Sequence, residues 1–282
     1  MTLLNIQMLG LCRFSYPSEV GAFRHNAQTM DELRAELYGP SRMATRFFFF
    51  EQIVLPALKV QTDPNFRMVL LAGERMPDEY KERLTALCSS VPQIEIVFAE
   101  EGRVHREICR EVMVRHRDPS ADIVAEFRID DDDAVATDCI ETGRSVVGAS
   151  YGLADQHGML CVDFAHGILL GFDRHGIRAQ NVKERMWTPA QIFCRRPDDK
   201  RSILDMNHMK AWAHMPTVSM ASRLMFVRGA HFGNDSDLLK RPRFAKDWGP
   251  LNGQIADRLA SRFGLDVDVL TNGWKALGHR SA

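Results

Sequence analysis

Four consecutive aspartates, Asp130–Asp133, stand between two apolar runs in the stretch "FRIDDDDAV". Adjacent carboxylates repel one another, and Arg128 is the only basic residue within this stretch. Carboxylates spaced as D-x-D supply the oxygen ligands that Mg²⁺ or Mn²⁺ prefers, and these ions also bind substrate phosphates. A bound cation would offset the repulsion between the carboxylates. The stretch therefore predicts a metal site in preference to a solvated acidic turn.

Side-chain direction selects two of the four carboxylates. Asp122–Ile129 has the pattern of a buried strand, in which alternate residues share a face. If the strand continues, Asp130 and Asp132 lie on the same polar face as Arg128. Asp131 would then point toward the apolar side, which is costly, so we expect the chain to turn there. The first and third aspartates are the predicted metal ligands, and the other two shape the turn.

Two other kinds of acidic site can be compared by their spacing. An EF-hand loop is excluded because Ala134 occupies its fifth position and Val135 replaces its required glycine. A phosphohydrolase would use Asp130 as nucleophile and Asp132 as acid and base, with further acids from Gly233–Asp237. Such a nucleophile normally follows the first strand of its domain, whereas three strand–helix units precede it here. The phosphohydrolase remains the alternative hypothesis.

Alternating strands and helices must position this site. The predicted strands are Leu4–Cys12, Phe66–Gly73, Ile94–Glu100 and Asp122–Ile129, and the predicted helices are Arg42–Leu55, Met76–Cys88, Val104–His116 and Ala136–Val147. The four phenylalanines of "RFFFFE" are expected in the core, and Pro56 is expected to end their helix. Alternation of this kind predicts an α/β fold with a mixed, largely parallel sheet and flanking helices. Ligands bind at the carboxyl ends of such strands, where the aspartates stand.

The second half of the chain has a less regular pattern. Gly158–Gly176 contains two short apolar runs that we expect to form a hairpin or paired strands. Ser202–His214 and Leu251–Phe263 are predicted helices, and Arg223–Gly229 is a predicted strand. No low-complexity linker separates the halves, so residues 1–282 are expected to form a single domain.

Composition excludes several classes of protein. The formal net charge of −1 over 282 residues argues against nucleic-acid binding. The six cysteines are scattered without a CxxC pair, which predicts free thiols in a reducing compartment. No apolar run is long enough for a transmembrane segment. We expect a cytoplasmic protein that is at most peripheral to the inner membrane.

These residues together resemble the rhamnosyltransferase-like family of bacterial glycosyltransferases, whose fold is of the GT-A type. The resemblance depends on "RFFFFEQIVLPALKVQTDPNFRMVLLAG" (Arg46–Gly73), "MPDEYKERL" and the D-x-D element in "FRIDDDDAV". It implies a GT-A-like, Rossmann-like fold for nucleotide-diphospho-sugar transfer. Residues 1–135 would bind the nucleotide-sugar, and residues 136–282 would bind the acceptor.

The resemblance also implies roles for individual residues. Asp130 and Asp132 would hold Mn²⁺ or Mg²⁺ against the diphosphate of the donor, with Asp130 and Asp131 also facing the nucleotide-sugar. Neutralising the charge that develops on a nucleoside-diphosphate leaving group is a task for a Lewis acid. Arg13 and Phe14, at the end of the first strand, would be placed for the nucleotide. Arg128 would pair with phosphate or compensate the aspartates.

The second half supplies the remaining candidates. His231 in "RGAHFGND" resembles the family's late His-x-x-Asn element and would be a third metal ligand, with His208 and His214 as competitors. An inverting transfer needs a carboxylate base, for which Asp205 is the candidate and Asp163 the alternative. The expected reaction moves a sugar, rhamnose by the family name alone, to a hydroxyl of a glycan, a lipid-linked acceptor or a protein.

Overall fold

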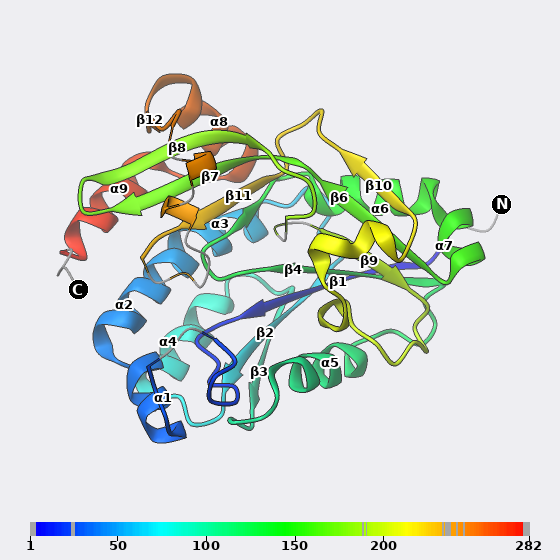
Figure 1. The fold of residues 1–282 in the computed structure, drawn as a ribbon, viewed down its shortest axis with the longest axis horizontal. Coiled ribbons are helices and arrows are strands. Elements are labelled where there is room, and N and C mark those ends of the chain that lie inside the picture. The colour runs from blue at the N-terminus through cyan, green and yellow to red at the C-terminus, as the bar shows by residue number, and fades with distance from the viewer. Residues whose placement is uncertain are drawn as a thin grey trace.

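The computed structural model describes residues 4–23, 26–187, 189, 191–232, 234, 238–240, 242–244 and 246–278. Its centre is a seven-stranded sheet in the order β10-β6-β9-β4-β1-β2-β3 (Figure 1). The strands are β1 (Ile6–Arg13), β2 (Arg67–Gly73), β3 (Ile94–Ala99), β4 (Ile123–Ile129), β6 (Met159–Phe164), β9 (Ile192–Arg195) and β10 (Thr217–Met220). Only β9 runs antiparallel to its neighbours in this sheet. The predicted mixed, largely parallel sheet is confirmed.

The order of the strands creates a switch point between β1 and β4. The chain builds outward from β1 through β2 to β3, and then returns to place β4 on the other side of β1. β1 and β4 are parallel, with Cys12 opposite Ile129. Arg13 and Asp130, the next residues along, therefore lie side by side at the carboxyl ends of these strands. Open α/β sheets bind ligands at such a position.

Helices cover both faces of this sheet, as expected for crossover connections. α5 (His105–Arg115) packs through Ile108, Cys109, Val112 and Met113 on the face that carries Leu9 and Leu11. α4 (Asp78–Cys88) and α6 (Cys139–Ala149) pack in the larger core on the opposite face. The three helices differ from their predicted bounds by at most three residues at either end. Alternation along β1 thus divides its side chains between two cores.

The phenylalanine-rich helix is longer than predicted. α2 (Pro40–Phe49) continues through a π-helical turn, Phe50–Val54, into α3 (Leu55–Lys59). The prediction that Pro56 ends this helix is wrong, because the proline stands in the first turn of α3, where its missing N–H costs no intrahelical hydrogen bond. The four phenylalanines are all buried, which confirms their expected place in the core.

A second sheet of five strands has the order β12-β8-β7-β11-β5. Its strands are β5 (Ala134–Val135), β7 (His166–Asp173), β8 (Gly176–Lys183), β11 (Phe226–Ala230) and β12 (Gly249–Pro250). The two apolar runs of Gly158–Gly176 do not pair with each other: β6 joins the first sheet, whereas β7 pairs with β8. Gly176, at φ +124°, allows the tight turn that makes β7 and β8 the hairpin.

The segment predicted as a helix over Ser202–His214 instead forms two short 3₁₀ turns, Ile203–Asp205 and His208–Ala213. At the N-terminal end of each turn, a polar side chain forms hydrogen bonds with nearby backbone N–H groups, which competes with formation of an α-helix. Ser202 and Asp205 form a reciprocal capping box, and Asn207 accepts a hydrogen bond from the N–H of Met209. Each polar side chain therefore starts a new turn, and a continuous helix does not form.

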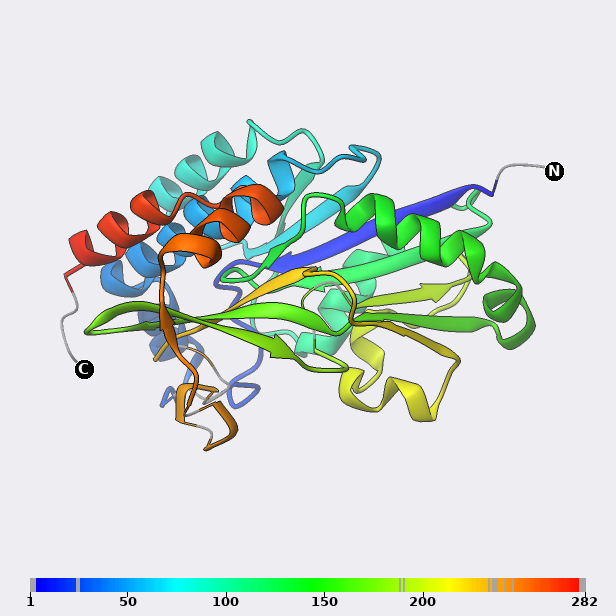
Figure 2. The same cartoon turned by 90° about the horizontal axis from the view of Figure 1, so that it is seen from above.

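Four α-helices and two 3₁₀ turns complete the described structure. The α-helices are α1 (Met30–Leu37), α7 (Tyr151–His157), α8 (Gly253–Phe263) and α9 (Val267–Ala276), and the 3₁₀ turns are Leu238–Lys240 and Pro242–Phe244. Only α8 was expected from the sequence. Figure 2 shows α8 and α9 beside the phenylalanine-rich helix, and the ring of Trp274 in α9 lies 5.7 Å from that of Phe48. All six cysteines are buried free thiols. Among the described residues, no helix has the length and apolarity needed to cross a membrane.

Candidate active site

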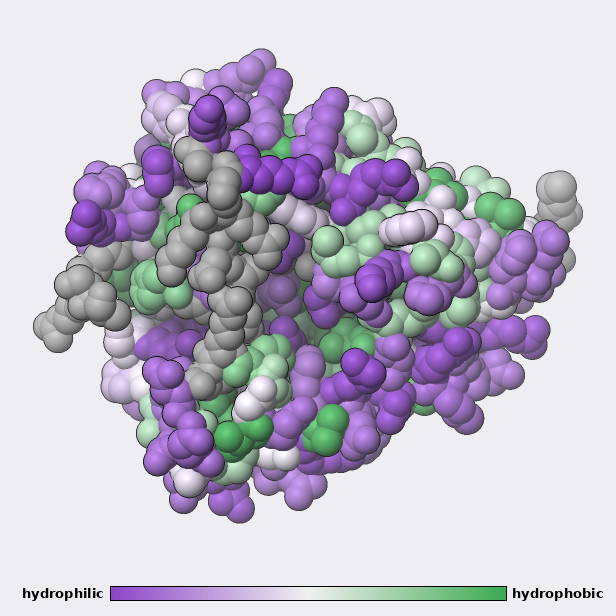
Figure 3. Space-filling model, viewed as in Figure 1, coloured by the Kyte–Doolittle hydropathy of each residue, from purple (hydrophilic) through white to green (hydrophobic). Residues whose placement is uncertain are grey.

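A cavity of about 790 Å³ opens at the carboxyl ends of β1 and β4. The face of the molecule drawn in Figure 3 is hollowed near its centre, with hydrophilic side chains around the hollow. Charged residues dominate the lining of the cavity: Arg13, Glu19, Arg42, Arg46, Arg106, Glu107, Arg110, Arg128, Asp130, Asp131, Asp132, Asp133, Asp205 and Arg228. An interior lined by arginines and aspartates is suited to a polar, charged ligand.

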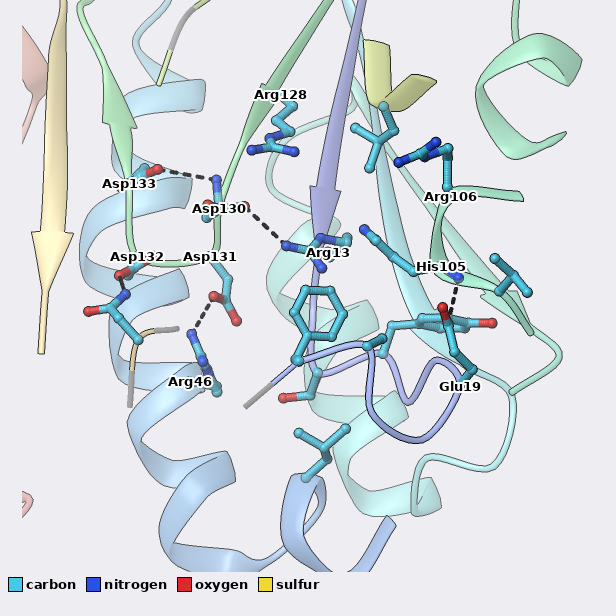
Figure 4. Close-up of a pocket in the computed structure, with 18 of the residues that line it drawn as sticks. Arg13, Glu19, Arg46, His105, Arg106, Arg128, Asp130, Asp131, Asp132 and Asp133 are labelled. Atoms are coloured by element: carbon cyan, nitrogen blue, oxygen red, sulfur yellow. Dashed lines mark hydrogen bonds and ion pairs between the residues drawn. The ribbon is translucent and has the colours of Figure 1, made fainter. Parts of the chain in front are cut away.

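The four aspartates form a tight turn at the end of β4. The strand ends at Ile129, and the N–H of Asp133 donates to the carbonyl of Asp130 at 3.1 Å. The expected turn is confirmed, but alternation stops with the strand. Each carboxylate is consequently directed toward a different partner, as the close-up shows (Figure 4).

Two of these carboxylates pair with arginines. Asp130 Oδ1 lies 3.5 Å from Arg13 Nη2, and Asp131 Oδ1 lies 2.6 Å from Arg46 Nη1 (Figure 4). Arg46 comes from α2, so the phenylalanine-rich helix contributes to the cavity as well as to the core. The ion pairs connect the turn to β1 on one side and to α2 on the other.

The other two carboxylates contact β11 and the residues after it. Asp132 Oδ2 lies 3.3 Å from His231 Nε2 and accepts a hydrogen bond from Asn234 Nδ2 at 2.7 Å. Asn234 Oδ1 in turn accepts from the N–H of His231 at 2.5 Å. Asp133 Oδ1 accepts from the N–H of Gly229 at 3.2 Å. The turn is thus held by both sheets.

The electrostatics of neighbouring aspartates differ. Burial raises the pKa of Asp130, but the charges of Arg128, Arg13 and Arg228 outweigh burial and lower that pKa to about 2. Burial raises the pKa of Asp131 to about 6, against the opposing charge of Arg46. Asp130 is therefore a permanently ionised carboxylate among three guanidinium groups.

The three predicted metal ligands are brought together only in part. Asp132 and His231 are adjacent and buried, whereas Asp130 is directed toward Arg13. Within the described ranges, no three His, Cys, Asp or Glu side chains converge as metal ligands. One carboxylate and one imidazole still fit Mn²⁺ or Mg²⁺, because such ions commonly take only one or two protein ligands beside phosphates and water. His231 is well placed for this, since its ring stacks on Phe49 at 4.5 Å.

Close approach of β11 to the aspartate turn requires a glycine. A Cβ atom at position 229 would lie 2.6 Å from the carbonyl oxygen of Asp132 and 2.7 Å from its Oδ2 atom. These distances are too short for any real Cβ contact, so either the strand or the turn would have to move. Gly229 is therefore a structural requirement of the site.

We expect Gly229→Ala to lower the free energy of unfolding by about 1–3 kcal/mol, the usual cost of overpacking, and to displace Asp132. Chemical denaturation measures the first effect. Gly152→Ala is the matched control, because a Cβ there meets nothing within 4 Å and the residue lies in α7. That control should be neutral or stabilising by up to about 1 kcal/mol. Equal unfolding free energies for the two variants would contradict the steric argument.

The opposite wall of the cavity carries aromatic side chains. The guanidinium of Arg13 lies 4.9 Å from the centre of the Phe23 ring, and that ring lies 5.0 Å from the ring of His105. The N–H of His105 donates to Glu19 Oε2 at 2.6 Å. Burial, with help from Arg13, lowers the pKa of His105 to about 3, so the imidazole is neutral at physiological pH.

Several residues of this cavity were missed in the sequence. Arg46 was assigned only to the edge of the core helix, and Arg228 and His105 were not singled out. His105 had a usable signal, because it follows the strand Ile94–Ala99 and must lie at the same edge of the sheet as Asp130. Arg228 had none, because its place depends on how the second sheet meets the first.

Two site predictions need correction. The ring of Phe14 is fully buried and packs on Phe47 and Phe50, so it faces the core and does not line the cavity. Asp163 is also fully buried and away from the cavity, with its carboxylate accepting from the N–H of Met186 and from Ser219 Oγ. Both side chains are taken up by packing or by local hydrogen bonds, which leaves them unable to reach a ligand.

Asp205 does line the cavity, from the first 3₁₀ turn. Its Oδ1 lies 3.0 Å from Arg110 Nη1, and its Oδ2 accepts from the N–H of Ser202 at 2.7 Å. Asp235 and Asp237, the further acids of the phosphohydrolase hypothesis, lie outside the described residues. Of the competing histidines, His208 lines a small neighbouring hollow with Arg128, and burial lowers its pKa to about 4.

Comparison with known proteins gives one family and several structures. Residues 7–242 match the protein family described as "Putative rhamnosyl transferase". No curated protein gives a significant match. Among solved structures, S. aureus TarS 1–349 is similar with 13% identity and a TM-score of 0.40, over 79% of this chain and 60% of that chain. The same fragment in complex with UDP gives 12% identity and a TM-score of 0.40 over the same shares.

The chain thus spans about three fifths of the TarS fragment that it resembles. The family match, by contrast, extends from β1 to beyond β11 and includes every residue assigned above to the aspartate turn and its partners. This match confirms the resemblance noted in the sequence. The chain belongs to the family described as "Putative rhamnosyl transferase", which by that description is a family of glycosyltransferases.

Proposed function

We propose that this protein transfers a sugar from a nucleoside-diphosphate sugar to an acceptor hydroxyl, with Mn²⁺ or Mg²⁺ held by Asp132 and His231. The observation that carries the proposal is the adjacency of these two side chains, which lie 3.3 Å apart. Asp132 is on the wall of the charged cavity beyond the end of β4, and His231 lines a neighbouring pocket. The family match supports the reaction class. Rhamnose as the sugar is proposed from the family description alone.

Different residues of the cavity would bind the metal and the nucleotide of the donor. The metal, when bound, supplies Lewis-acid stabilisation of the leaving diphosphate. Asn234 orients Asp132 through a 2.7 Å hydrogen bond, which fixes the carboxylate before the donor arrives. Arg13 places a cation between Asp130 and the aromatic ring of Phe23, at the side of the cavity where a nucleotide can stack. Preorganised charges of this kind favour the transition state over the ground state.

Asp205 is the proposed general base for the acceptor. Its carboxylate lies on the cavity wall in the second half of the chain. Its contact with Arg110 fixes its direction, and a carboxylate within reach of the acceptor hydroxyl can remove the proton as the glycosidic bond forms. The acceptor is proposed to be a glycan, a lipid-linked glycan or a protein. We propose a cytoplasmic location, at the inner membrane surface when the acceptor is lipid-linked.

Thermal unfolding with nucleoside diphosphates tests the proposed function. UDP, GDP and dTDP are added singly, with Mn²⁺ or with EDTA, and the unfolding midpoint is recorded. We expect one of the three to raise the midpoint in the presence of Mn²⁺, because a ligand that binds only the native state stabilises it. The identity of that nucleotide names the donor base. Failure of all three with Mn²⁺ would overturn the donor site.

The phosphohydrolase alternative is tested in the same preparation. A phosphohydrolase with Asp130 as nucleophile should release phosphate from a generic aryl phosphate, whereas the transferase should not. The pairing of Asp130 with Arg13 and its position among three arginines favour a carboxylate that compensates charge. Phosphate release that disappears in Asp130→Asn would favour the alternative.

A further inference from the structure

Two arginines of the cavity have no carboxylate partner among the described residues. Arg128 and Arg228 are partly buried and line the cavity. Within the part of the chain that the structure describes, neither guanidinium forms a hydrogen bond or an ion pair, and Arg128 Nε is buried without an acceptor. A buried polar group without a partner is costly, so each such group needs an explanation. Other partly buried arginines in this chain do have carboxylate partners: Arg13 with Asp130, Arg144 with Asp63 and Arg262 with Asp138.

The two arginines reach the cavity from different sheets. Arg128 is the last residue but one of β4, and Arg228 lies in the middle of β11. The guanidinium of Arg228 lies 4.8 Å from the centre of the buried Trp187 ring, which holds the side chain in place. Both arginines line the same cavity as Asp130, and their charges lower the pKa of its carboxyl group. Figure 4 shows Arg128 beside Asp130 and Asp133.

The carboxylates near Arg128 and Arg228 are occupied by other donors. Arg13, Arg128 and Arg228 line the cavity together with Asp130, and Asp130 is paired with Arg13. The carboxylate of Asp133 also faces this region, but its oxygens accept from the backbone N–H groups of Gly229 and Asp130. The arginines therefore leave positive charge and unused N–H donors directed at the cavity. An anion is the ligand that satisfies both.

We propose that Arg128 and Arg228 form a phosphate-binding site that works without the metal. A guanidinium presents a planar fork of donors that matches two phosphate oxygens, and two forks from different strands suit a diphosphate or phosphate ester. Arg128 stands at the switch point between β1 and β4, on the Arg13 side of the aspartate turn, and Arg228 reaches the cavity from β11. The proposed metal ligands, Asp132 and His231, are different residues. Phosphate can thus be bound by two independent sets of residues.

If the bound phosphate belongs to the donor, this inference rests on the proposed function; if it belongs to the acceptor, it does not. The phosphate is either part of the donor diphosphate or a group carried by the acceptor, and the chemistry of recognition is the same for both. Inorganic pyrophosphate is a probe that needs neither a nucleotide nor a metal. Its binding can therefore succeed even where every nucleoside diphosphate fails.

The test is calorimetric titration with pyrophosphate in EDTA at constant ionic strength. We expect the wild type to bind, and Arg128→Gln/Arg228→Gln to bind about tenfold more weakly or worse, as lost charge-assisted hydrogen bonds imply. Arg128→Lys retains the charge but not the fork, and should bind with intermediate affinity. Arg196→Gln is the matched control, because it removes one charge from a side chain that is 73% exposed and outside the cavity lining.

Circular dichroism and the unfolding midpoint establish that each variant is folded, and the single Arg128→Lys change keeps the test open if the double variant is not. Absence of pyrophosphate binding to the wild type, or equal binding by wild type and double variant, overturns the proposal. Competition between pyrophosphate and the stabilising nucleoside diphosphate, both in EDTA, assigns the site to the donor. Simultaneous binding assigns it to a phosphate on the acceptor.

Discussion

Asp132→Asn is expected to reduce sugar transfer by about 10²–10³-fold, the loss typical when one preorganised group that stabilises developing charge is removed. The substitution retains the size of the side chain and an oxygen that can accept from Asn234 Nδ2. It removes the negative charge that Asp132 offers beside His231. The same variant should lose the Mn²⁺-dependent part of the stabilisation by nucleoside diphosphate, measured as the difference in unfolding midpoint between Mn²⁺ and EDTA.

The second measurement separates metal binding from damage to the fold. Asp198→Asn serves as the control, because that carboxylate is 76% exposed and lies outside the cavity. It should leave both transfer and the Mn²⁺ effect unchanged. An Asp132→Asn protein that still shows the full Mn²⁺-dependent shift would contradict the role of this carboxylate as a metal ligand.

Arg117→Met is expected to lower the free energy of unfolding by about 3–5 kcal/mol, because it leaves a buried carboxylate without its cation. Arg117 Nη2 lies 2.6 Å from Glu126 Oε1, and both side chains are almost completely buried. Arg117 also donates to the carbonyl oxygens of Asp199 and Arg201. Glu126 Oε2 accepts from the N–H of Ile203 at 2.7 Å, so the same pair anchors the 3₁₀ turn that carries Asp205.

Chemical denaturation measures this loss, with Arg115→Met as the matched control, two residues earlier at the end of α5. Arg115 pairs with Glu111 on the surface, at 63% side-chain exposure, and its replacement should cost less than about 0.5 kcal/mol. The double variant Arg117→Met/Glu126→Leu should recover much of the stability, because it removes the buried charge together with its partner. A double variant no more stable than Arg117→Met would contradict this explanation.

The pH dependence of Arg117→Met follows from the same pair. Burial raises the pKa of Glu126, and Arg117 opposes that rise, so the variant should raise it further. A carboxyl group whose pKa is higher in the folded than in the unfolded state binds more protons when folded. Stability of the variant should therefore increase as the pH falls from 7 toward 5, with a steeper slope than in the wild type.

Much of the site could be predicted because it depends on the alternation of apolar and polar residues along single strands. Alternation along β1 and β4, and the position of Arg13 and Asp130 just at their ends, are visible in the printed residues. The same alternation could have corrected one error, since Phe14 shares the parity of Cys12, which faces the core. The turn at the aspartates was predicted from the cost of burying a carboxylate.

The remainder depends on contacts that no local pattern contains. β6 and β7 follow each other closely in the chain but belong to different sheets: β6 pairs with β9 and β10, whereas β7 pairs with β8 and β11. The partners of Asp131 and Asp133, Arg46 and Gly229, come from a core helix and a later strand. The 3₁₀ turns around Asp205 depend on capping side chains that compete with helix formation.

The spread of these partners along the chain has a consequence for how the protein folds. Asp130 and Arg13 are 117 residues apart, Asp131 and Arg46 are 85 apart, and Asp132 and Asn234 are 102 apart. Contacts between distant residues form slowly, because long loops must be closed first. During synthesis, the aspartates emerge well before β11, so a nascent chain carries Asp132 and Asp133 without their later partners, Gly229, His231 and Asn234. Competence to bind the donor should thus arise late, as one of the last events of folding.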